Sequence, residues 1–352
     1  MSAAVAWRCD VDLAALNTFH VQARARRFCR VDSVEALQAA AADCRARNTQ
    51  PFVLGGGSNL LIVGDLDMPV IQPALAGLSV ASMNNDCVEL QAAAGEPWDA
   101  VVSFACREGL WGVENLALIP GTAGAAPVQN IGAYGVELGD CLAWVEALDL
   151  VDLSLRQLSR NELALGYRDS RFKAEPGRWI ITRIAIHLQR SPQPKLGYAG
   201  LREAFGDRSP TQPGEVAEAV RAIRRRKLPD PHQIGNAGSF FKNPEVTDAM
   251  AADLAALHQG LPAFPGSRAG LSKLSAAWLI ERAGCKGLRR GDAGVSDQHA
   301  LVLVNHGAAN GRELLDLAWE VRDRVHGRFG VQLEPEPIVL GEPHPAREHP
   351  RA

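Results

Sequence analysis

The chain has 352 residues, of which 47% are apolar and 22% are charged. This length predicts two or three domains, because one hydrophobic core seldom serves more than about 250–300 residues, and the composition excludes wholesale disorder and a collagen-like fibre. The net charge is -3, which argues against nucleic acid or an anionic membrane as the main partner.

The sequence has no pattern typical of export or of a metal site. No stretch is apolar enough to span a bilayer, and the first ten residues lack the basic region and apolar core of a secretory signal. The seven cysteines are widely spaced without a CxxC pair, and the histidines form no HxH or HExxH. We therefore expect no disulfide framework, no metal, a reducing cytoplasm, and cysteines that act as small buried or half-buried hydrophobes.

The first part of the chain is predicted to be α/β. Ser33 is the N-cap candidate of a helix that ends near Arg47, and a second helix is expected from Trp98 to Glu108. Apolar runs predict strands at residues 51–54, 60–63, 88–92, 141–151 and 179–188.

Proline-containing linkers at residues 191–194 and 209–214 precede the last part of the chain. A basic amphipathic helix from Glu215 to Lys227 ends at Leu228-Pro229-Asp230-Pro231, where we expect a domain boundary. Beyond it, the pattern predicts helices near 247–258, 272–283 and 312–328, and strands at 300–305 and 338–340. The polar tail after Gly341 is expected to fray.

Two glycine-rich segments lie in the first part. Gly55-Gly56-Gly57-Ser58-Asn59 follows a strand directly, and consecutive glycines let several backbone N–H groups face one anion such as a diphosphate. A tight hairpin turn explains this segment equally well. It is neither a GxGxxG motif nor a P-loop, so both common nucleotide motifs are absent.

The second segment, from Ile119 to Gly135, is nearly uncharged and too small in its side chains to form a core. Small residues would let a planar ring system lie flat against the backbone, and Gln129 and Asn130 could supply hydrogen bonds. A close-packed loop without a ligand is the alternative. Two such segments in one half of the chain favour the ligand.

Three further clusters are candidates for chemistry. Arg168 lies in the polar segment 167–173 and suits a carboxylate or phosphate, although a solvated turn explains that composition better. Ser239, in a predicted loop from Asn236 to Pro244, is a possible nucleophile, proton donor or cap, and the GxSxG motif is absent. Glu336 is either an ordinary exposed acid or a buried one with a shifted pKa.

Six segments of the chain, taken together in order, closely resemble the MurB family of UDP-N-acetylenolpyruvoylglucosamine reductases, flavin enzymes of peptidoglycan precursor synthesis. The segments are residues 16–19, 54–61, 114–137, 167–173, 227–243 and 333–336, which span nearly the whole chain.

The resemblance implies an α/β (α+β) fold. It consists of an FAD-binding pair of domains of the vanillyl-alcohol-oxidase (PCMH) type, followed by a C-terminal substrate-binding α/β domain. The first FAD-binding subdomain would comprise residues 1–75 with 338–352, the second 76–226, and the substrate-binding domain 227–337. The extreme C-terminus would pack back onto the first domain.

The resemblance also implies the activity, that of an FAD-dependent NADPH oxidoreductase, UDP-N-acetylmuramate dehydrogenase. It would reduce UDP-N-acetylglucosamine enolpyruvate to UDP-N-acetylmuramate in the cytoplasm, for cell-wall biogenesis, cell shape and cell division. FAD would be bound non-covalently and NADPH would be the reductant. The partner would be a small nucleotide sugar, with no nucleic acid and no membrane; a monomer is favoured, and the oligomeric state stays open.

Site residues follow from the same resemblance, position by position. Catalysis is assigned to Arg168, Ser239 and Glu336, with Ser239 as proton donor and the other two stabilising an enolate. Cofactor contacts are assigned to Gly55, Gly56, Gly57, Ser58, Asn59, Ile119, Pro120, Gly121, Gly124, Ala125, Ala126, Asn130 and Gly132. Substrate contacts are assigned to Tyr134, Tyr167, Tyr198, Lys227, Asn243 and His299, and Tyr198 resembles the family tyrosine on a loop that closes over the substrate.

The chain departs from the family at several positions, none of them catalytic. Ala125-Ala126 replaces a pair that is often serine, and His299 stands where some members have glutamine. Phe264 stands where some members have tyrosine, and Pro337-Ile338 where some have Val-Arg.

Two other functions remain open at this stage. One is a flavin oxidase of the same broad fold that uses dioxygen, and the other is a non-catalytic binding protein. The set of Tyr167, Arg168, Ser239 and Glu336 favours the reductase over the oxidase, and we find no histidine or cysteine motif for covalent flavin attachment.

Overall fold

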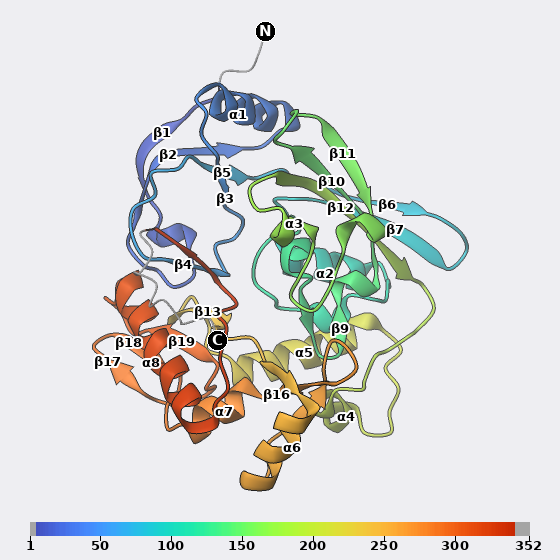
Figure 1. Ribbon diagram of the computed structural model, residues 1–352. Coiled ribbons are helices and arrows are strands. Elements are labelled where there is room, and N and C mark those ends of the chain that lie inside the picture. Colours follow the sequence, from blue (N-terminus) through green and yellow to red (C-terminus); the bar gives the residue numbers. More distant parts are fainter. Residues whose placement is uncertain (1–4, 342–352) are drawn as a thin grey trace. The chain divides into compact units, whose positions relative to one another are not determined.

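The computed structural model describes residues 5–341 (Figure 1). Internal contacts divide this part of the chain into two units. The first unit comprises residues 5–11, Ala25–Gly56 and Asp67–Arg226, and the second comprises Asp12–Arg24, Gly57–Leu66 and residues 227–341. The second unit thus takes two short segments from the N-terminal part of the chain. The predicted division into three domains stays a prediction.

The first unit contains a four-stranded sheet in the order β1-β2-β5-β3, in which β2, β5 and β3 run parallel. Its strands are β1 (Arg8–Asp12), β2 (Arg24–Val31), β3 (Phe52–Val53) and β5 (Val70–Pro73). Helix α1 (Val34–Ala46) buries Leu37, Ala40, Ala41 and Cys44 in the cluster that contains Cys29 and Val31 of β2. Ser33 caps this helix as predicted, because its side chain accepts from the Ala36 N–H.

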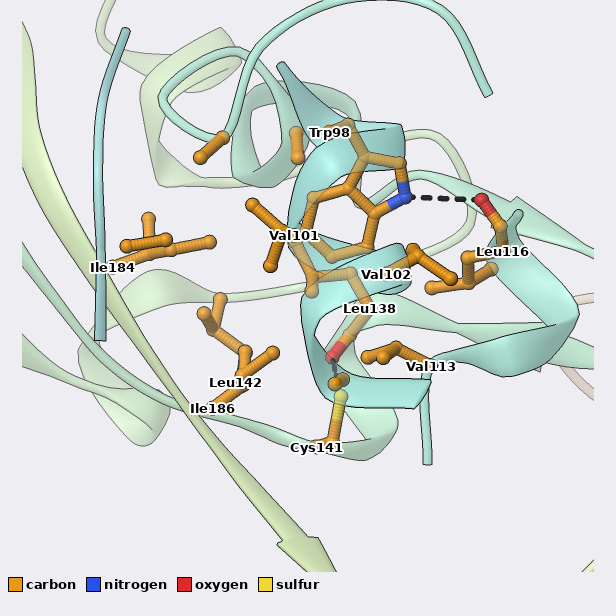
Figure 2. Close-up of a cluster of buried hydrophobic side chains, with 14 of the residues drawn as sticks. Trp98, Val101, Val102, Val113, Leu116, Leu138, Cys141, Leu142, Ile184 and Ile186 are labelled. Carbon is orange, nitrogen blue, oxygen red and sulfur yellow. Dashed lines mark hydrogen bonds between the residues drawn. The ribbon is translucent and has the colours of Figure 1, made fainter. Parts of the chain in front are cut away.

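A five-stranded antiparallel sheet in the order β11-β10-β12-β7-β6 forms the larger part of the first unit. Its strands are β6 (Leu78–Ser82), β7 (Cys87–Ala93), β10 (Leu142–Asp149), β11 (Leu155–Ser159) and β12 (Trp179–Gln189). Helices α2 (Trp98–Arg107) and α5 (Pro213–Lys227) contribute apolar side chains to the same core. In Figure 2, Trp98 and Val101 of α2 lie near Ile184 of β12.

The first unit also contains a short hairpin, β8 (Gly132–Ala133) and β9 (Val136–Glu137), and two short helices, α3 (Arg171–Ala174) and α4 (Ala199–Phe205). The hairpin turn is Tyr134-Gly135, with φ of 52° and 80°. A two-residue turn with both φ values positive matches the twist of the flanking strands. The glycine-rich segment therefore ends in a tight turn that presents a tyrosine.

The second unit contains a four-stranded sheet, a three-stranded sheet, a pair of parallel strands and three α-helices within the described residues. One sheet has the order β13-β19-β18-β17 and the other β14-β16-β15. Their strands are β13 (Gly235–Ser239), β14 (Glu245–Thr247), β15 (Ala263–Pro265), β16 (Leu271–Leu274), β17 (Arg289–Arg290), β18 (Ala293–Val295) and β19 (Val302–Asn305). The helices are α6 (Asp248–Leu257), α7 (Ala276–Arg282) and α8 (Gly311–Phe329).

In the same unit, β4 (Leu60–Ile62) pairs in parallel with β20 (Ile338–Leu340). Helix α8 begins directly against β4, because a Cβ at Gly311 would overlap the Ile62 carbonyl oxygen. The C-terminal strand thereby joins the strand that follows the first glycine-rich segment.

Three local predictions are wrong. The helix expected from residue 272 begins only at Ala276, because 271–274 pair in β16 and Ser275 caps the helix. The loop expected at 236–244 begins instead as strand β13, with a register shift between Asn236 and Ser239 where Gly238 has a φ of 70°. Cys9 on β1 is exposed rather than buried.

The remaining global findings concern residues 5–341 only. No helix there has the length and hydropathy that a membrane crossing requires. Histidine, cysteine and acidic side chains in these residues form no group able to hold a metal ion. The predicted fraying and docking of the C-terminal tail fall on residues 342–352, outside the described residues.

Candidate active site

The first glycine-rich segment, Gly55–Asn59, connects β3 to β4. The backbone N–H groups of these five residues donate to no acceptor within the described part of the chain. Gly57 has a φ of 64°, and a Cβ there would overlap the Leu16 carbonyl oxygen, so only glycine fits. A run of unpaired N–H groups is the kind of backbone that binds a phosphate.

Gly55 and Gly56, the part of the first glycine-rich segment that belongs to the first unit, lie against the second segment. A Cβ on Gly56 would lie 3.0 Å from the Gly121 Cα, and one on Gly55 would lie 3.2 Å from the Ala125 Cβ. Gly121 is itself fixed, because its carbonyl accepts from the Trp98 N–H at 3.0 Å. The Gly124 N–H donates to the Ala94 carbonyl at 2.9 Å. The two segments thus meet with almost no side-chain bulk between them, which fits a dinucleotide such as FAD.

Other predicted cofactor residues shape the loop. Ile119 is half-buried and Pro120 exposed, and Ala126 opens a 3-10 turn. Asn130 is buried with a φ of 43°; its side chain accepts from the Gly139 N–H and donates to Glu137 and to a backbone carbonyl. The Asn130 side chain therefore holds the loop, and its contact with a cofactor stays a prediction.

Arg168 stands in a turn of the first unit with a φ of 53°, which is uncommon for a residue other than glycine. Its Nη2 donates to the Gly132 carbonyl at 2.9 Å, and its guanidinium lies 5.5 Å from the centre of the Tyr167 ring. The Lys173 ammonium donates to the Arg168 carbonyl at 2.9 Å. Arg168 is half-buried, so the structure holds it in place more firmly than a solvated turn would.

Arg224 of α5 belongs to the same group of side chains, although the sequence alone does not single it out. Its guanidinium lies beside the Tyr134 hydroxyl, and its Nε is buried without a hydrogen-bond partner in the described part of the chain. Burial lowers the pKa of Arg224, the positive charge of Arg168 lowers it further, and burial raises the pKa of Tyr134. Two guanidinium groups whose charges act on one another suit an anionic ligand. The missed signal was helical spacing, since Arg224 follows Ala217 and Val220 on the apolar face of α5.

The segments that carry Ser239 and Glu336 lie side by side in the second unit. The Glu336 N–H donates to the Phe240 carbonyl at 2.8 Å, which places Glu336 beside the residue that follows Ser239. Asn59 of the first glycine-rich segment donates from its side chain to the Glu336 carbonyl at 3.3 Å. Phe240 and Phe241 are fully buried and anchor the end of β13. Ser239 and Glu336 are both half-buried, so Glu336 is not an ordinary surface acid.

A buried asparagine shapes the strand that ends at Ser239. Asn236 donates to the Pro229 and Ile234 carbonyls, and its side-chain oxygen accepts from the Gly238 N–H at 3.0 Å. These bonds fix the irregular part of β13 just before the serine.

Three predicted substrate residues also lie in the second unit. The Asn243 side-chain oxygen accepts from the Ala276 N–H at the start of α7. His299 Nδ1 accepts from the Leu301 N–H at 3.3 Å, which leaves Nε2 as the ring's donor. Burial lowers the pKa of His299, and nearby Lys227 and Lys286 lower it further, which favours the neutral imidazole. Lys227 itself is exposed.

The predicted catalytic residues therefore fall into two groups, each described within its own unit. Arg168 lies with Gly132, Tyr134 and Tyr167 in the first unit. Ser239 lies with Glu336 in the second. Tyr198, in the first unit, is 39% exposed and its ring contacts that of Tyr134.

Comparison with known proteins identifies two family models in the chain. Residues 25–154 match an FAD binding domain, and residues 230–340 match the C-terminal domain of UDP-N-acetylenolpyruvoylglucosamine reductase. The first match contains both glycine-rich segments, and the second contains Ser239 and Glu336.

Curated relatives match over almost the whole chain. The UDP-N-acetylenolpyruvoylglucosamine reductase of Xanthomonas oryzae pv. oryzae is 47% identical over 94% of this chain and 97% of the relative. The enzyme of the same name from Chromobacterium violaceum is 47% identical over 95% of this chain and 99% of the relative. The crystal structure of UDP-N-acetylenolpyruvylglucosamine reductase (MurB) from Thermus caldophilus superimposes with a TM-score of 0.66 at 27% identity, covering 96% of this chain and all of that one. The chain therefore belongs to the UDP-N-acetylenolpyruvoylglucosamine reductase (MurB) family and is an FAD-dependent oxidoreductase.

Proposed function

We propose that the chain uses NADPH to reduce UDP-N-acetylglucosamine enolpyruvate to UDP-N-acetylmuramate, a cytoplasmic step in the synthesis of peptidoglycan precursors. The observation that carries the proposal is the backbone hydrogen bond from Glu336 to Phe240, because it brings Glu336 next to the segment of Ser239, a residue far away in the sequence. The names of the 44–47% identical relatives support the same reaction.

The reaction adds a hydride to the methylene carbon of the enolpyruvyl group and a proton to the adjacent carbon. The double bond becomes a single bond, so the substrate gains two electrons and NADPH loses two. FAD, when bound, supplies the hydride chemistry, which no side chain provides. The chain must therefore bind the substrate, stabilise the negative charge that hydride addition creates, and deliver a proton.

Arg168 suits the stabilising role. Hydride addition moves negative charge onto the carboxylate as an enolate, and a planar guanidinium matches a carboxylate through two parallel hydrogen bonds. Its bond to the Gly132 carbonyl and the left-handed backbone at Arg168 hold the group before the substrate arrives. Such preorganised charge is often worth about 3–4 kcal/mol in the transition state. Glu336 would orient the carboxylate region or share a proton with it.

Ser239 suits the proton-donor role. A hydroxyl is a weak acid, but the carbon of an enolate is a strong base, so the transfer is feasible if the geometry is held. The buried Phe240 and Phe241, together with the Asn236 turn, fix the backbone on both sides of the serine.

The six predicted substrate residues would hold the nucleotide sugar. Lys227 carries an exposed positive charge suited to the diphosphate. His299 would donate a hydrogen bond through Nε2. In this role the imidazole would replace the side-chain amide of the glutamine that some members have at this position. Tyr134, Tyr167, Tyr198 and Asn243 would complete the contacts.

An anaerobic titration tests this proposal. The purified protein should show flavin absorbance near roughly 370 and 450 nm, which NADPH should bleach. The enolpyruvyl substrate should then restore the absorbance without oxygen. A flavin that only dioxygen reoxidises would contradict the proposal and support the oxidase.

A further inference from the structure

Asn115 joins two segments of the first unit that carry tyrosines. Its side chain is fully buried, and its amide nitrogen donates to the Tyr134 carbonyl at 2.9 Å and to the Lys195 carbonyl at 2.8 Å. Each of its two amide hydrogens is therefore used for one segment. Tyr198 follows three residues after Lys195, and its ring meets the Tyr134 ring edge to face, with centroids 4.8 Å apart.

Asn115 lies in a turn that hydrogen bonds hold in the core of the first unit. It is the middle residue of the 3-10 turn Glu114–Leu116. The Leu116 carbonyl accepts from the Trp98 indole at 3.0 Å (Figure 2), and the Glu114 carboxylate accepts from the Gly112 N–H at 2.6 Å. Because these groups are buried, the turn is a fixed base for the Asn115 amide.

The two segments that Asn115 holds have little regular structure of their own. Tyr134 occupies the left-handed region at a φ of 52°, which is costly for a residue other than glycine. Residues 190–198 lie in no helix or strand. Lys195 also pairs with Asp140 at 3.1 Å, but both side chains are about half exposed, and such pairs stabilise little. The buried hydrogen bonds of the Asn115 amide therefore hold these two segments more strongly than the exposed Lys195–Asp140 pair does.

Asn115 joins distant parts of the chain, as the buried Asn130 and Asn305 also do through the Gly166 and Phe19 carbonyls. Asn17 and Asn236 bond to groups within seven residues of themselves. The two partners of Asn115 lie 19 and 80 residues away. A single amide nitrogen therefore fixes the distance between two separate segments.

We propose that Asn115 is a positioning residue that sets the spacing of the Tyr134–Tyr198 pair, because it fixes the backbone from which each ring projects. The spacing of the rings is a property of the protein without substrate. Only the kinetic consequence rests on the proposed function, in which both tyrosines contact the substrate.

Fluorine NMR tests the proposal directly. The chain has only three tyrosines, Tyr134, Tyr167 and Tyr198, so labelling with 3-fluorotyrosine gives three resonances that Tyr→Phe variants assign. In the parent, Tyr198→Leu should shift the Tyr134 resonance, since the rings are in contact. In the Asn115→Ala background this shift should be lost, because the two segments are no longer tied together. A full shift in folded Asn115→Ala would overturn the proposal.

Two further variants keep the test decisive. Asn115→Gln keeps both donors but carries them one methylene further, so the shift should change in that background as well, even if the alanine variant does not fold. Val145→Ala removes buried bulk from β10 without touching Asn115, and it should preserve the shift while lowering the melting temperature. If Val145→Ala abolished the shift as Asn115→Ala does, the shift would report general loosening and the proposal would fail.

Kinetics separate this proposal from the proposed function. In Asn115→Ala, the KM for the enolpyruvyl substrate should rise roughly tenfold, while flavin reduction by NADPH stays unchanged. A raised KM with an unchanged fluorine shift would contradict the positioning role. A parent protein that shows the fluorine shift but does not reduce the enolpyruvyl substrate would refute the proposed function and leave the positioning role standing.

Discussion

Arg168 owes its position to backbone geometry as much as to side-chain contacts. A φ of 53° turns the chain so that the guanidinium reaches back to Gly132. The strained backbone conformation of Arg168 is consistent with a role in the active site, because backbone strain is often found where functional side chains must be held in position.

We predict that Arg168→Lys lowers turnover by about 10²–10³-fold while flavin content stays near normal. The positive charge survives, but the planar fork that matches a carboxylate is lost. Steady-state rates and the flavin-to-protein absorbance ratio measure the two effects. The exposed Arg190→Lys serves as the control and should behave like the parent. Parent-like turnover in Arg168→Lys would remove Arg168 from the enolate-stabilising role.

Among single residues, the sequence singles out those that belong to distinctive motifs. Ser239 and Glu336 were candidates from local pattern and resemblance, and the structure places their segments side by side. Asn115 and Arg224 were not candidates, because their roles arise from contacts across the fold. An asparagine in a chain of apolar residues, or an arginine in a basic helix, has many ordinary explanations until its partners are known.

At the scale of single elements, the end of β10 depends on a buried carboxylate. The Asp149 side chain is fully buried and receives two hydrogen bonds from Arg178, at 2.9 and 3.3 Å. It also accepts from the Val151 N–H at 3.0 Å, so one acid fixes both the strand end and the turn after it. The Arg178 guanidinium holds the pKa of Asp149 below its usual 3.8.

We predict that Asp149→Asn lowers the free energy of unfolding at pH 7 by about 1–3 kcal/mol. The sign of the pH dependence follows from the lowered pKa. The carboxylate stabilises the fold fully above the unfolded pKa of 3.8, and this contribution disappears as the pH falls through the lower pKa of the folded state. Denaturant unfolding of parent and variant, measured from pH 7 downward, should therefore converge in acid. A difference that does not change with pH would exclude this role, and exposed Asp253→Asn should cost little at any pH.

Elements with strong periodicity were predictable, whereas paired strands of mixed composition were not. The helices α1, α2, α5 and α8 lie within a few residues of their predicted ranges, since capping and apolar spacing act locally. The sequence of β13, Gly-Asn-Ala-Gly-Ser, predicts a loop because it has low strand propensity. Its pairing with β19 overrides that propensity, and such pairing is invisible in a short window of sequence.

At the scale of the whole molecule, we expect the flavin to be held without a covalent bond. The glycine-rich segments provide backbone donors and close approach, and they contain no histidine or cysteine for covalent attachment of a flavin. Acid precipitation should leave a yellow supernatant and a colourless pellet. Colour retained in the pellet would show a covalent link.

Domain organisation was the least predictable level. The end of α5 lies at the predicted domain boundary, and there the chain passes from the first unit to the second. That residues 12–24 and 57–66 group with the C-terminal part could not be inferred from the sequence, because both groupings rest on contacts between residues far apart in the chain. These contacts are the hydrogen bond from the Asn236 N–H to the Thr18 carbonyl and the parallel pairing of β4 with β20.

The catalytic cycle as a whole has two halves, and Ser239 is proposed to act in only one. The most direct test is stopped-flow absorbance of the flavin in Ser239→Ala, measured without oxygen for each half-reaction. Reduction by NADPH needs no proton from the serine and should stay fast. Reoxidation by the enolpyruvyl substrate should slow by about 10²–10⁴-fold, and Ser239→Cys should retain more activity because a thiol can donate a proton. If alanine slowed both half-reactions equally, the serine would serve binding or folding, and the account of the site would be wrong.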